Sequence, residues 1–104
     1  MQTGFARVAA LIGEPARATM LLSLLDGRAL PAGELAFSAN VAPQTASGHL
    51  AKLVEGGLLS VETQGRHRYY RLAGPDVGTA LEALGELAPS PRVRDHESEQ
   101  VRVL

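Results

Sequence analysis

The pattern of hydrophobic and polar positions along the chain predicts five helices and one β-hairpin. Apolar residues recur at helical spacing in five segments, which are separated by the Gly, Pro, Asp and Asn residues that favour turns. The five segments cover about residues 5–12, 15–25, 32–38, 43–55 and 76–88. The second segment is apolar nearly all round, which predicts a central buried helix. In the third segment, we expect Leu35, Ala36 and Phe37 to face inward.

The hairpin is predicted between the fourth and fifth helices. Gly56-Gly57 ends the fourth helix, and one of these glycines is expected to adopt a positive φ as a C-cap. The first strand, the turn and the second strand cover residues 58–63, 64–66 and 67–72. Tyr69 and Tyr70 point to opposite faces of the second strand, so one is expected in the core and the other at the surface. The predicted fold class is mainly α with a small β-hairpin (α+β).

The fourth segment places a hydrogen-bonding face opposite an apolar stripe. Pro43 suits its first helical position, because it lacks the N–H that would have no partner there. The stripe consists of Ala46, Leu50, Leu53 and Val54. The opposite face has small donors and acceptors and little charge, which suits a helix that reads base edges in a DNA major groove. The residues of this helix predicted to contact DNA are Gln44, Thr45, Ser47, Gly48, His49 and Lys52.

Basic residues gather near the hairpin turn. Arg66, His67 and Arg68 are expected to reach DNA phosphates, although such residues also keep the edge of a sheet soluble. The whole chain has a formal net charge of −1, whereas residues 42–72 contain four Lys and Arg against two Glu. Specific contacts, dimerisation or both must therefore supply the affinity that diffuse electrostatics cannot.

Taken in order along the chain, these residues resemble the winged helix-turn-helix of ArsR/SmtB-type bacterial transcriptional regulators. The reading helix of that family has the form VSQ(P/S)TVSxHLxxLxxAGLV and precedes a wing rich in Arg and Tyr. Residues 13–17 also resemble its A-D-P-T-R helix start, and residues 33–36 resemble the start of its positioning helix. The resemblance covers roughly residues 5–88. The matching positions in the helix and wing are Val41, Thr45, Ser47, His49, Leu50, Leu53, Gly57, Leu58, Arg68, Tyr69 and Tyr70.

The resemblance implies a winged helix-turn-helix with about five helices and a two-stranded wing. It also implies a repressor that binds double-stranded DNA as a homodimer, with one reading helix in each half of a palindromic operator. The family usually has Ser-Gln where this chain has Ala42-Pro43, so we assign the role of that Gln to Gln44. Gly48 replaces a frequent His, so one contact is expected to be lost. Arg17 has two alternatives, contact with a phosphate or capping of a neighbouring element.

The first and last predicted helices form the candidate dimer interface. The last helix has a narrow, heptad-like apolar stripe, which is typical of a helix that packs against a partner helix. The predicted interface residues are Phe5, Val8, Ile12, Val77, Leu81, Leu84 and Leu87. After this helix the composition changes to Pro, Ser, Arg, Asp and Glu. We therefore expect a DNA-binding and dimerisation domain over 1–88 and a flexible polar tail over 89–104.

Metal sensing is a function that the family resemblance invites. The chain contains no Cys, so it has no thiolate metal site, disulfide or redox switch. Zinc-type relatives place His and carboxylate ligands on the last helix. Here His49, His67 and His96 fall on the reading helix, the wing and the tail. We expect no metal site and no cofactor. The alternative is a metal-responsive sensor whose non-thiol site is built from the tail, around Asp95 and Glu97, or across the dimer.

Other function classes find less support in the sequence. There is no Cys nucleophile, no Gly-rich phosphate loop and no Ser-His-Asp arrangement in a plausible context, so we expect no enzymatic activity and no catalytic residues. A winged helix can also serve as a protein-interaction module, but such modules tend to lack a basic wing. No signal peptide or membrane-spanning run is visible, so a cytoplasmic location is expected. No motif identifies the operator or the inducing signal.

Overall fold

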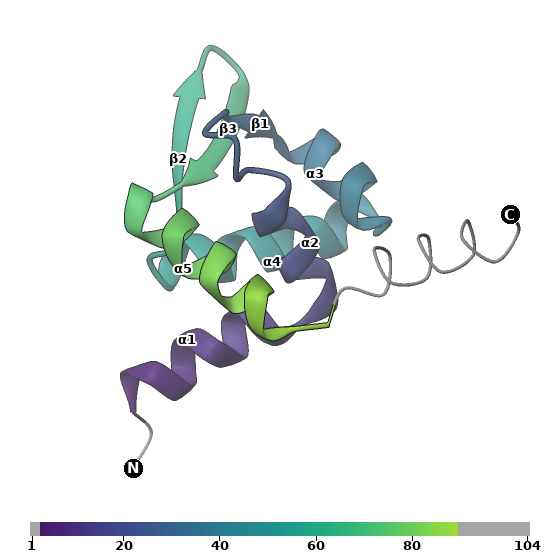
Figure 1. Cartoon of the computed structure of the whole chain (residues 1–104). Helices are drawn as coiled ribbons and strands as arrows, with labels where there is room; N and C mark the ends of the chain where they lie inside the picture. Colours follow the sequence, from purple (N-terminus) through teal and green to yellow (C-terminus); the bar gives the residue numbers. More distant parts are fainter. Residues whose placement is uncertain (1–2, 90–104) are drawn as a thin grey trace, which may run out of the picture.

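The computed structural model describes residues 3–89, which form five helices and a three-stranded sheet (Figure 1). The elements are α1 Gly4–Gly13, α2 Pro15–Leu22, β1 Leu30–Pro31, α3 Ala32–Ala39, α4 Pro43–Glu55, β2 Leu59–Gln64, β3 His67–Leu72 and α5 Pro75–Leu87. The predicted helices and the hairpin are confirmed. Apart from Pro89, the predicted tail lies outside the described residues. No described helix has the length and apolar character needed to cross a membrane.

The hydrophobic core lies where α2, α3 and α4 pack together. Its largest fully buried side chains come from these helices and from the turn after α2, and they are Met20, Leu21, Leu24, Leu35, Leu50 and Leu53. Tyr70 of β3 and Leu81 of α5 extend the same cluster. Because the core takes up one face of α4, the opposite face of this helix must point away from the protein.

α2 ends earlier than the sequence pattern predicts. The Ser23 N–H donates to the Thr19 carbonyl at 3.0 Å, and the chain then turns at Gly27, which has a φ of 88°. Leu24 stays buried although it is outside the helix, whereas Leu22 is 52% exposed. The helix is therefore buried on the side of Met20 and Leu21, whereas Leu22 lies on a side that the core leaves uncovered, although the whole segment is apolar.

Phe37 is the clearest departure from the prediction. We expected it to face inward, but 88% of its surface is exposed. The residues of α3 that pack into or against the core are Ala32, Leu35, Ala36 and Ala39. This is the i, i+3, i+4, i+7 spacing of a single helix face. Phe37 is rotated by about 100° from Ala36 around the helix axis and therefore lies on the solvent side.

The sheet contains one strand more than the predicted two-stranded wing. β3 is central and pairs antiparallel with β2 on one side and with β1 on the other. In the β1 pairing, Leu30 lies opposite Tyr70 and Pro31 opposite Tyr69. Proline has no N–H to donate to a neighbouring strand, so Pro31 suits an edge strand such as β1. A strand of two residues that includes a proline also shows no alternating pattern in the sequence. Tyr70 is buried in the core, as expected for one of the two tyrosines, whereas Tyr69 is half-buried rather than exposed.

A tight turn joins α3 to α4. Asn40 ends α3 in the left-handed conformation, with a φ of 57°, and its N–H lies within bonding distance of the Ala36 and Phe37 carbonyls. Asn tolerates this conformation better than most residues. Ala42 and Pro43 then begin α4 without any side-chain cap. The close succession of two helices gives the helix-turn-helix geometry that the sequence predicted.

Two glycines end α4 in different ways. Gly56 is the C-cap with an ordinary φ of −80°, and Gly57 has a φ of 85°, which confirms the expected positive φ. A Cβ added at Gly56 would overlap the Leu11 δ-methyl group of α1. The absence of a side chain at Gly56 therefore allows α1 to approach the end of α4 closely.

We predict opposite stability effects for alanine at two glycines of this region. Gly57→Ala should lower the free energy of unfolding by about 1–2 kcal/mol, because it forces an L-residue into the left-handed region. Gly48→Ala is the matched control, since Gly48 lies within α4 with open space around its missing Cβ, and it should raise the free energy of unfolding by about 1 kcal/mol. Urea denaturation at one fixed protein concentration measures both changes. Equal effects of the two variants on the free energy of unfolding would contradict the left-handed conformation of Gly57.

Candidate nucleic-acid interface

α4 presents the predicted polar face to solvent. The exposed residues of this face are Gln44, Thr45, Ser47, Gly48 and Lys52. On the opposite side, Ala46, Leu50 and Leu53 are completely buried and hold the helix against the core. The two charged residues of α4 are Lys52 and Glu55, both in its C-terminal half. The N-terminal half therefore offers hydrogen-bonding groups without a negative charge that would repel DNA.

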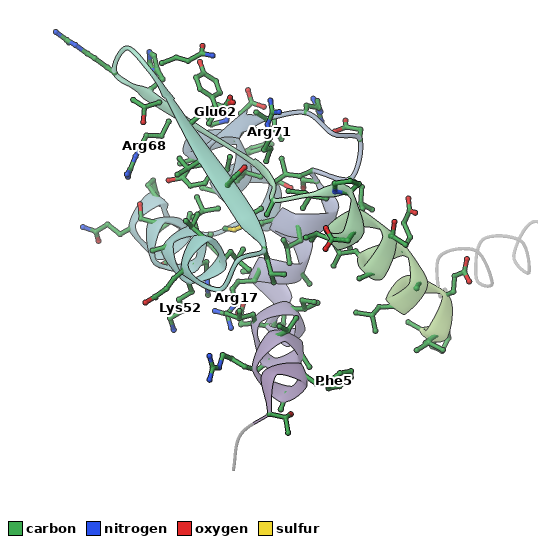
Figure 2. The ribbon with its side chains drawn as sticks, turned by 90° about the vertical axis from the view of Figure 1, so that its left-hand side faces the viewer. Phe5, Arg17, Lys52, Glu62, Arg68 and Arg71 are labelled. Atoms are coloured by element: carbon green, nitrogen blue, oxygen red, sulfur yellow. The ribbon has the colours of Figure 1, made fainter. Side chains whose placement is uncertain are left out.

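The wing lies beside this helix, and a groove separates the two. The groove has a volume of about 390 Å³ and is lined by Ser47, Ala51, Val54, Glu55, Val61, Arg68 and Tyr70. Figure 2 shows Arg68 projecting from the hairpin on the side of α4. Ser47 and Arg68, which were predicted from separate segments, therefore border one surface. The structure brings the reading helix and the basic wing together.

The other basic residues of the wing are arranged differently. Arg66 is exposed at the hairpin turn. His67 is two residues before Tyr69 on β3, and their rings meet edge to face with centroids 6.4 Å apart. Alternation along the strand places both on the face opposite to Arg68 and Tyr70. Arg71 is 3.8 Å from the Glu62 carboxylate on β2. Of the wing arginines, Arg68 thus borders the groove beside α4 and Arg66 lies exposed at the turn.

His49 does not lie on the exposed face with the other residues predicted to contact DNA. Its Nδ1 is 3.0 Å from Nη1 of Arg17, and its side chain is only 17% exposed. Its Nε2 is 3.8 Å from Oε1 of Glu14. We predicted that His49 contacts a base, and that Arg17 either contacts a phosphate or caps a neighbouring element. The residues are 32 positions apart, and no local pattern predicts their contact.

Glu14 connects this cluster to the start of α2. Its carboxylate accepts a hydrogen bond from the backbone N–H of Arg17 at 2.8 Å and so caps the helix. This hydrogen bond is the main cause that lowers the pKa of Glu14 below its usual value; burial opposes it, and the neighbouring His49 and Arg17 add smaller lowering effects. Glu14 is therefore ionised at neutral pH and adds a negative charge beside His49.

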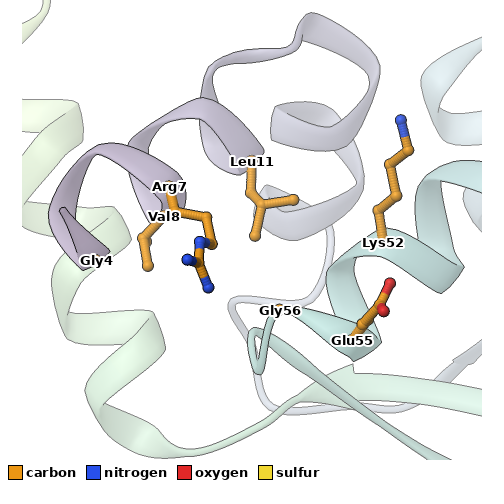
Figure 3. A pocket seen from close by; sticks show the side chains of 7 residues that line it. All are labelled: Gly4, Arg7, Val8, Leu11, Lys52, Glu55 and Gly56. Atoms are coloured by element: carbon orange, nitrogen blue, oxygen red, sulfur yellow. The ribbon is translucent and has the colours of Figure 1, made fainter. Parts of the chain in front are cut away.

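A second groove separates α1 from the end of α4 (Figure 3). It measures about 450 Å³ and is lined by Gly4, Arg7, Val8, Leu11, Lys52, Glu55 and Gly56. Lys52 projects along the α1 side of α4, while Arg7 extends from α1 toward the same space. The sequence reasoning did not select Arg7. Its position indicates that α1 borders the predicted DNA-binding face.

The predicted dimer residues fall into two groups. Phe5, Val8, Leu84 and Leu87 are exposed, with Phe5 at 84% and Leu87 at 82%. Leu81 is instead buried in the core of its own chain, at 5% exposure, and Ile12 and Val77 pack partly against that core. The heptad-like stripe of α5 is therefore divided. Leu81, in the middle of the helix, packs into the core, whereas Leu84 and Leu87, in the C-terminal half, are exposed to solvent. The structure does not support Leu81 as an exposed interface residue.

The described residues do not assemble a metal site. Over residues 3–89, no group of three or more His, Cys, Asp or Glu side chains is placed to hold an ion. The alternative site built around Asp95, His96 and Glu97 lies outside the described residues.

Comparison with known proteins agrees with this geometry. A family model described as a helix-turn-helix domain matches residues 12–62. The chain is 52% identical over 94 residues to YdfF of Bacillus subtilis, an uncharacterized HTH-type transcriptional regulator. The match covers 90% of this chain but only 42% of YdfF. It is 34% identical over 86 residues to the HTH-type transcriptional regulator CmtR of Mycobacterium tuberculosis, covering 83% of this chain and 70% of CmtR.

The chain is also similar to solved structures. A homodimeric winged helix-turn-helix DNA-binding domain from Mycobacterium bovis, described as a possible ArsR-family regulator, matches with a TM-score of 0.75 and 28% identity. The match covers 89% of this chain and 83% of that one. The fold and the site define a winged helix-turn-helix protein. The chain belongs to the ArsR-type family of HTH transcriptional regulators, as the sequence resemblance indicated.

Proposed function

We propose that this protein is a homodimeric repressor that binds a palindromic double-stranded DNA operator. The observation that carries the proposal is the exposed N-terminal half of α4 beside Arg68 of the wing, across one groove. Base-reading side chains and a phosphate-binding cation thus share a surface. The homodimeric DNA-binding domain from Mycobacterium bovis, with its similar fold, supports the dimer. A protein of this function acts in the cytoplasm, where bacterial DNA is accessible.

In this proposal α4 enters the major groove with its N-terminal half, as recognition helices usually do. Gln44 pairs with an adenine edge, the Thr45 methyl group contacts a thymine, and Ser47 bonds to either kind of base edge. Gly48 allows the helix backbone to approach the groove closely. Lys52, Arg66 and Arg68 contact phosphates. His67 stays a candidate for backbone contact on the outer face of the wing.

Dimerisation uses the apolar surface of α1 and α5. Among the described residues, α1 buries none within its own chain, although it is largely apolar. Large exposed apolar side chains such as Phe5 and Leu87 are a recognised sign of an interface. To read two half-sites one helical turn of DNA apart, two copies related by a two-fold axis must hold their α4 helices about 34 Å apart. A palindromic operator matches that symmetry.

The signal that relieves repression is proposed to differ from cadmium sensing through thiolate ligands. A solved structure of CmtR is described as that of a cadmium metal-sensor, 34% identical to this chain with a TM-score of 0.62. Soft thiolate ligands are absent here because the chain has no Cys. We therefore propose a repressor of the ArsR type without a thiol metal site.

The proposal is tested by fluorescence anisotropy with DNA from upstream of the protein's own gene and with shuffled DNA, across a salt series. Tight, sequence-selective and salt-dependent binding is the expected result. Weak binding that is insensitive to both sequence and salt would contradict it and favour a protein-interaction module. Loss of DNA affinity on adding zinc, reversed by a chelator, would instead indicate a metal-responsive sensor.

We predict that Gln44→Ala weakens operator binding by roughly 1–3 kcal/mol, because a bidentate contact to adenine is lost. The loss should be confined to particular base positions, as measured by anisotropy on a set of single-substitution operators. An equal loss on operator and shuffled DNA would remove Gln44 from base reading.

Arg68→Ala should weaken binding to all sequences alike and reduce the salt slope by about one. Arg71→Ala is the matched control, because Arg71 lies on the opposite face of β3 and faces Glu62. It should leave the salt slope nearly unchanged. If both variants alter the slope equally, Arg68 has no special position relative to the phosphates.

Phe5→Glu should raise the dissociation constant of the dimer by more than about tenfold, because a charge replaces an apolar anchor at the interface. Phe37→Glu is a closely matched control, with 88% exposure against 84% for Phe5 but a place on α3. Sedimentation equilibrium measures both. Dissociation by Phe37→Glu and not by Phe5→Glu would place the dimer interface elsewhere.

A further inference from the structure

The side chain of Arg17 lies at the junction of α1, α2 and α4 (Figure 2). It is half-buried and turns back from the first turn of α2 toward the end of α1. Its Nε donates to the Leu11 carbonyl at 2.8 Å, and its Nη2 donates to the Ala10 carbonyl at 3.4 Å. These carbonyls belong to the last turn of α1, where helical carbonyls have no partner within the helix. A cation is also favourable at this negative end of the helix dipole.

The remaining amino group of the same guanidinium reaches α4. Nη1 of Arg17 is 3.0 Å from Nδ1 of His49. Arginine has only donors, so His49 Nδ1 must accept, and the imidazole proton must be on Nε2. That nitrogen faces the Glu14 carboxylate at 3.8 Å. One charged, planar group thus binds the end of α1 and a side chain of the reading helix at the same time.

His49 has a defined place on α4 relative to the residues proposed to read DNA. It is one helical turn after Thr45 and next to Gly48, on the edge of the helix that contacts Arg17 and Glu14. Leu50 and Leu53 fix the buried face of α4 by apolar packing, which tolerates small rotations. A directional hydrogen bond at the edge of the helix restricts rotation about its axis.

We propose that Arg17 is a positioning residue for operator recognition, which acts through His49 to fix the orientation of α4 relative to α1. This inference rests on the proposed function, in which α1 carries part of the dimer interface and α4 reads DNA. In a two-fold dimer, both reading helices must match their half-sites together. The Arg17 side chain of α2, which binds both the end of α1 and His49 of α4, supplies that registration. Arg17 therefore contributes to sequence selectivity without touching the DNA.

Selectivity and salt dependence separate this role from a direct phosphate contact. Binding to unrelated DNA depends mainly on phosphate charge and tolerates small errors in helix orientation, whereas base reading does not. Loss of a positioning contact should therefore weaken operator binding while leaving the salt slope unchanged. Loss of a phosphate contact would weaken both kinds of binding and reduce the slope by about one.

The experiment compares the full chain with five variants on two duplexes, one of them the double variant Arg17→Met with His49→Leu. The probes are a duplex selected from a randomised library by the wild-type protein and a duplex of shuffled sequence. Arg17→Met keeps the length of the apolar stem and removes the guanidinium. His49→Leu removes the acceptor, whereas His49→Asn retains an acceptor near the position of Nδ1. Arg28→Met is the charge control, because Arg28 is exposed and pairs with Asp26 away from α4.

Arg17→Met and His49→Leu should each weaken binding to the selected duplex by about tenfold and change binding to the shuffled duplex by less than about threefold. The double variant should lose no more than the worse single variant, since the two residues act through one contact. His49→Asn should restore most of the selectivity, and Arg28→Met should retain it. Thermal unfolding and sedimentation confirm that each variant is folded and dimeric.

Four results would overturn the inference. Additive losses in the double variant, or a salt slope that falls by about one in Arg17→Met, would show that the residues act separately or that Arg17 binds phosphate. Full selectivity in both Arg17→Met and His49→Leu would remove the positioning role while leaving the proposed function intact. Failure of the wild-type protein to select any sequence would overturn the proposed function and this inference with it.

Discussion

The structure depends most on the burial of one face of α4 against α2 and α3. Ala46, Leu50 and Leu53 have no exposed surface, and Met20 and Leu35 fill the core on the other side. This packing determines which face of α4 is buried and which face points outward. Since each buried leucine contributes roughly 1.5–3 kcal/mol of apolar burial, the helix is held firmly even though its own sequence contains Gly48 and lacks an N-terminal cap. The outward position of the polar face of α4 is thus a consequence of core packing.

A firm helix alone does not make a selective DNA-binding protein. The chain has almost no net charge, so long-range attraction cannot supply most of its affinity. Its cations are instead local, at Lys52 beside α1 and at Arg66 and Arg68 on the wing. Selectivity then requires that two reading helices be held at a defined distance and angle. The contacts that join α1 to α4, at Leu11 with Gly56 and at Arg17 with His49, lie where such geometry can be set.

Much of the fold and part of the candidate site could be predicted from local patterns. The spacing of apolar residues located all five helices, and Gly57 marked the end of α4 because positive φ is a local property of glycine. β1 was missed because two residues, one of them proline, carry no periodic signal. Phe37 was misplaced because a hydrophobic side chain beside two buried neighbours looks the same in the sequence whether or not it faces the core.

The sequence by itself determined the order of the five helices and the hairpin, the polar face of α4, the basic wing and the absence of thiol chemistry. These features follow from residue type and short-range spacing, which are properties of the linear chain. Only the tertiary structure decided that Ser47 and Arg68 share a groove, that Leu81 belongs to the core and that His49 turns toward Arg17. Those outcomes depend on how helices cross and on which residues meet over long sequence separations. Such meetings are set by the packing of the whole core, so no local pattern could specify them.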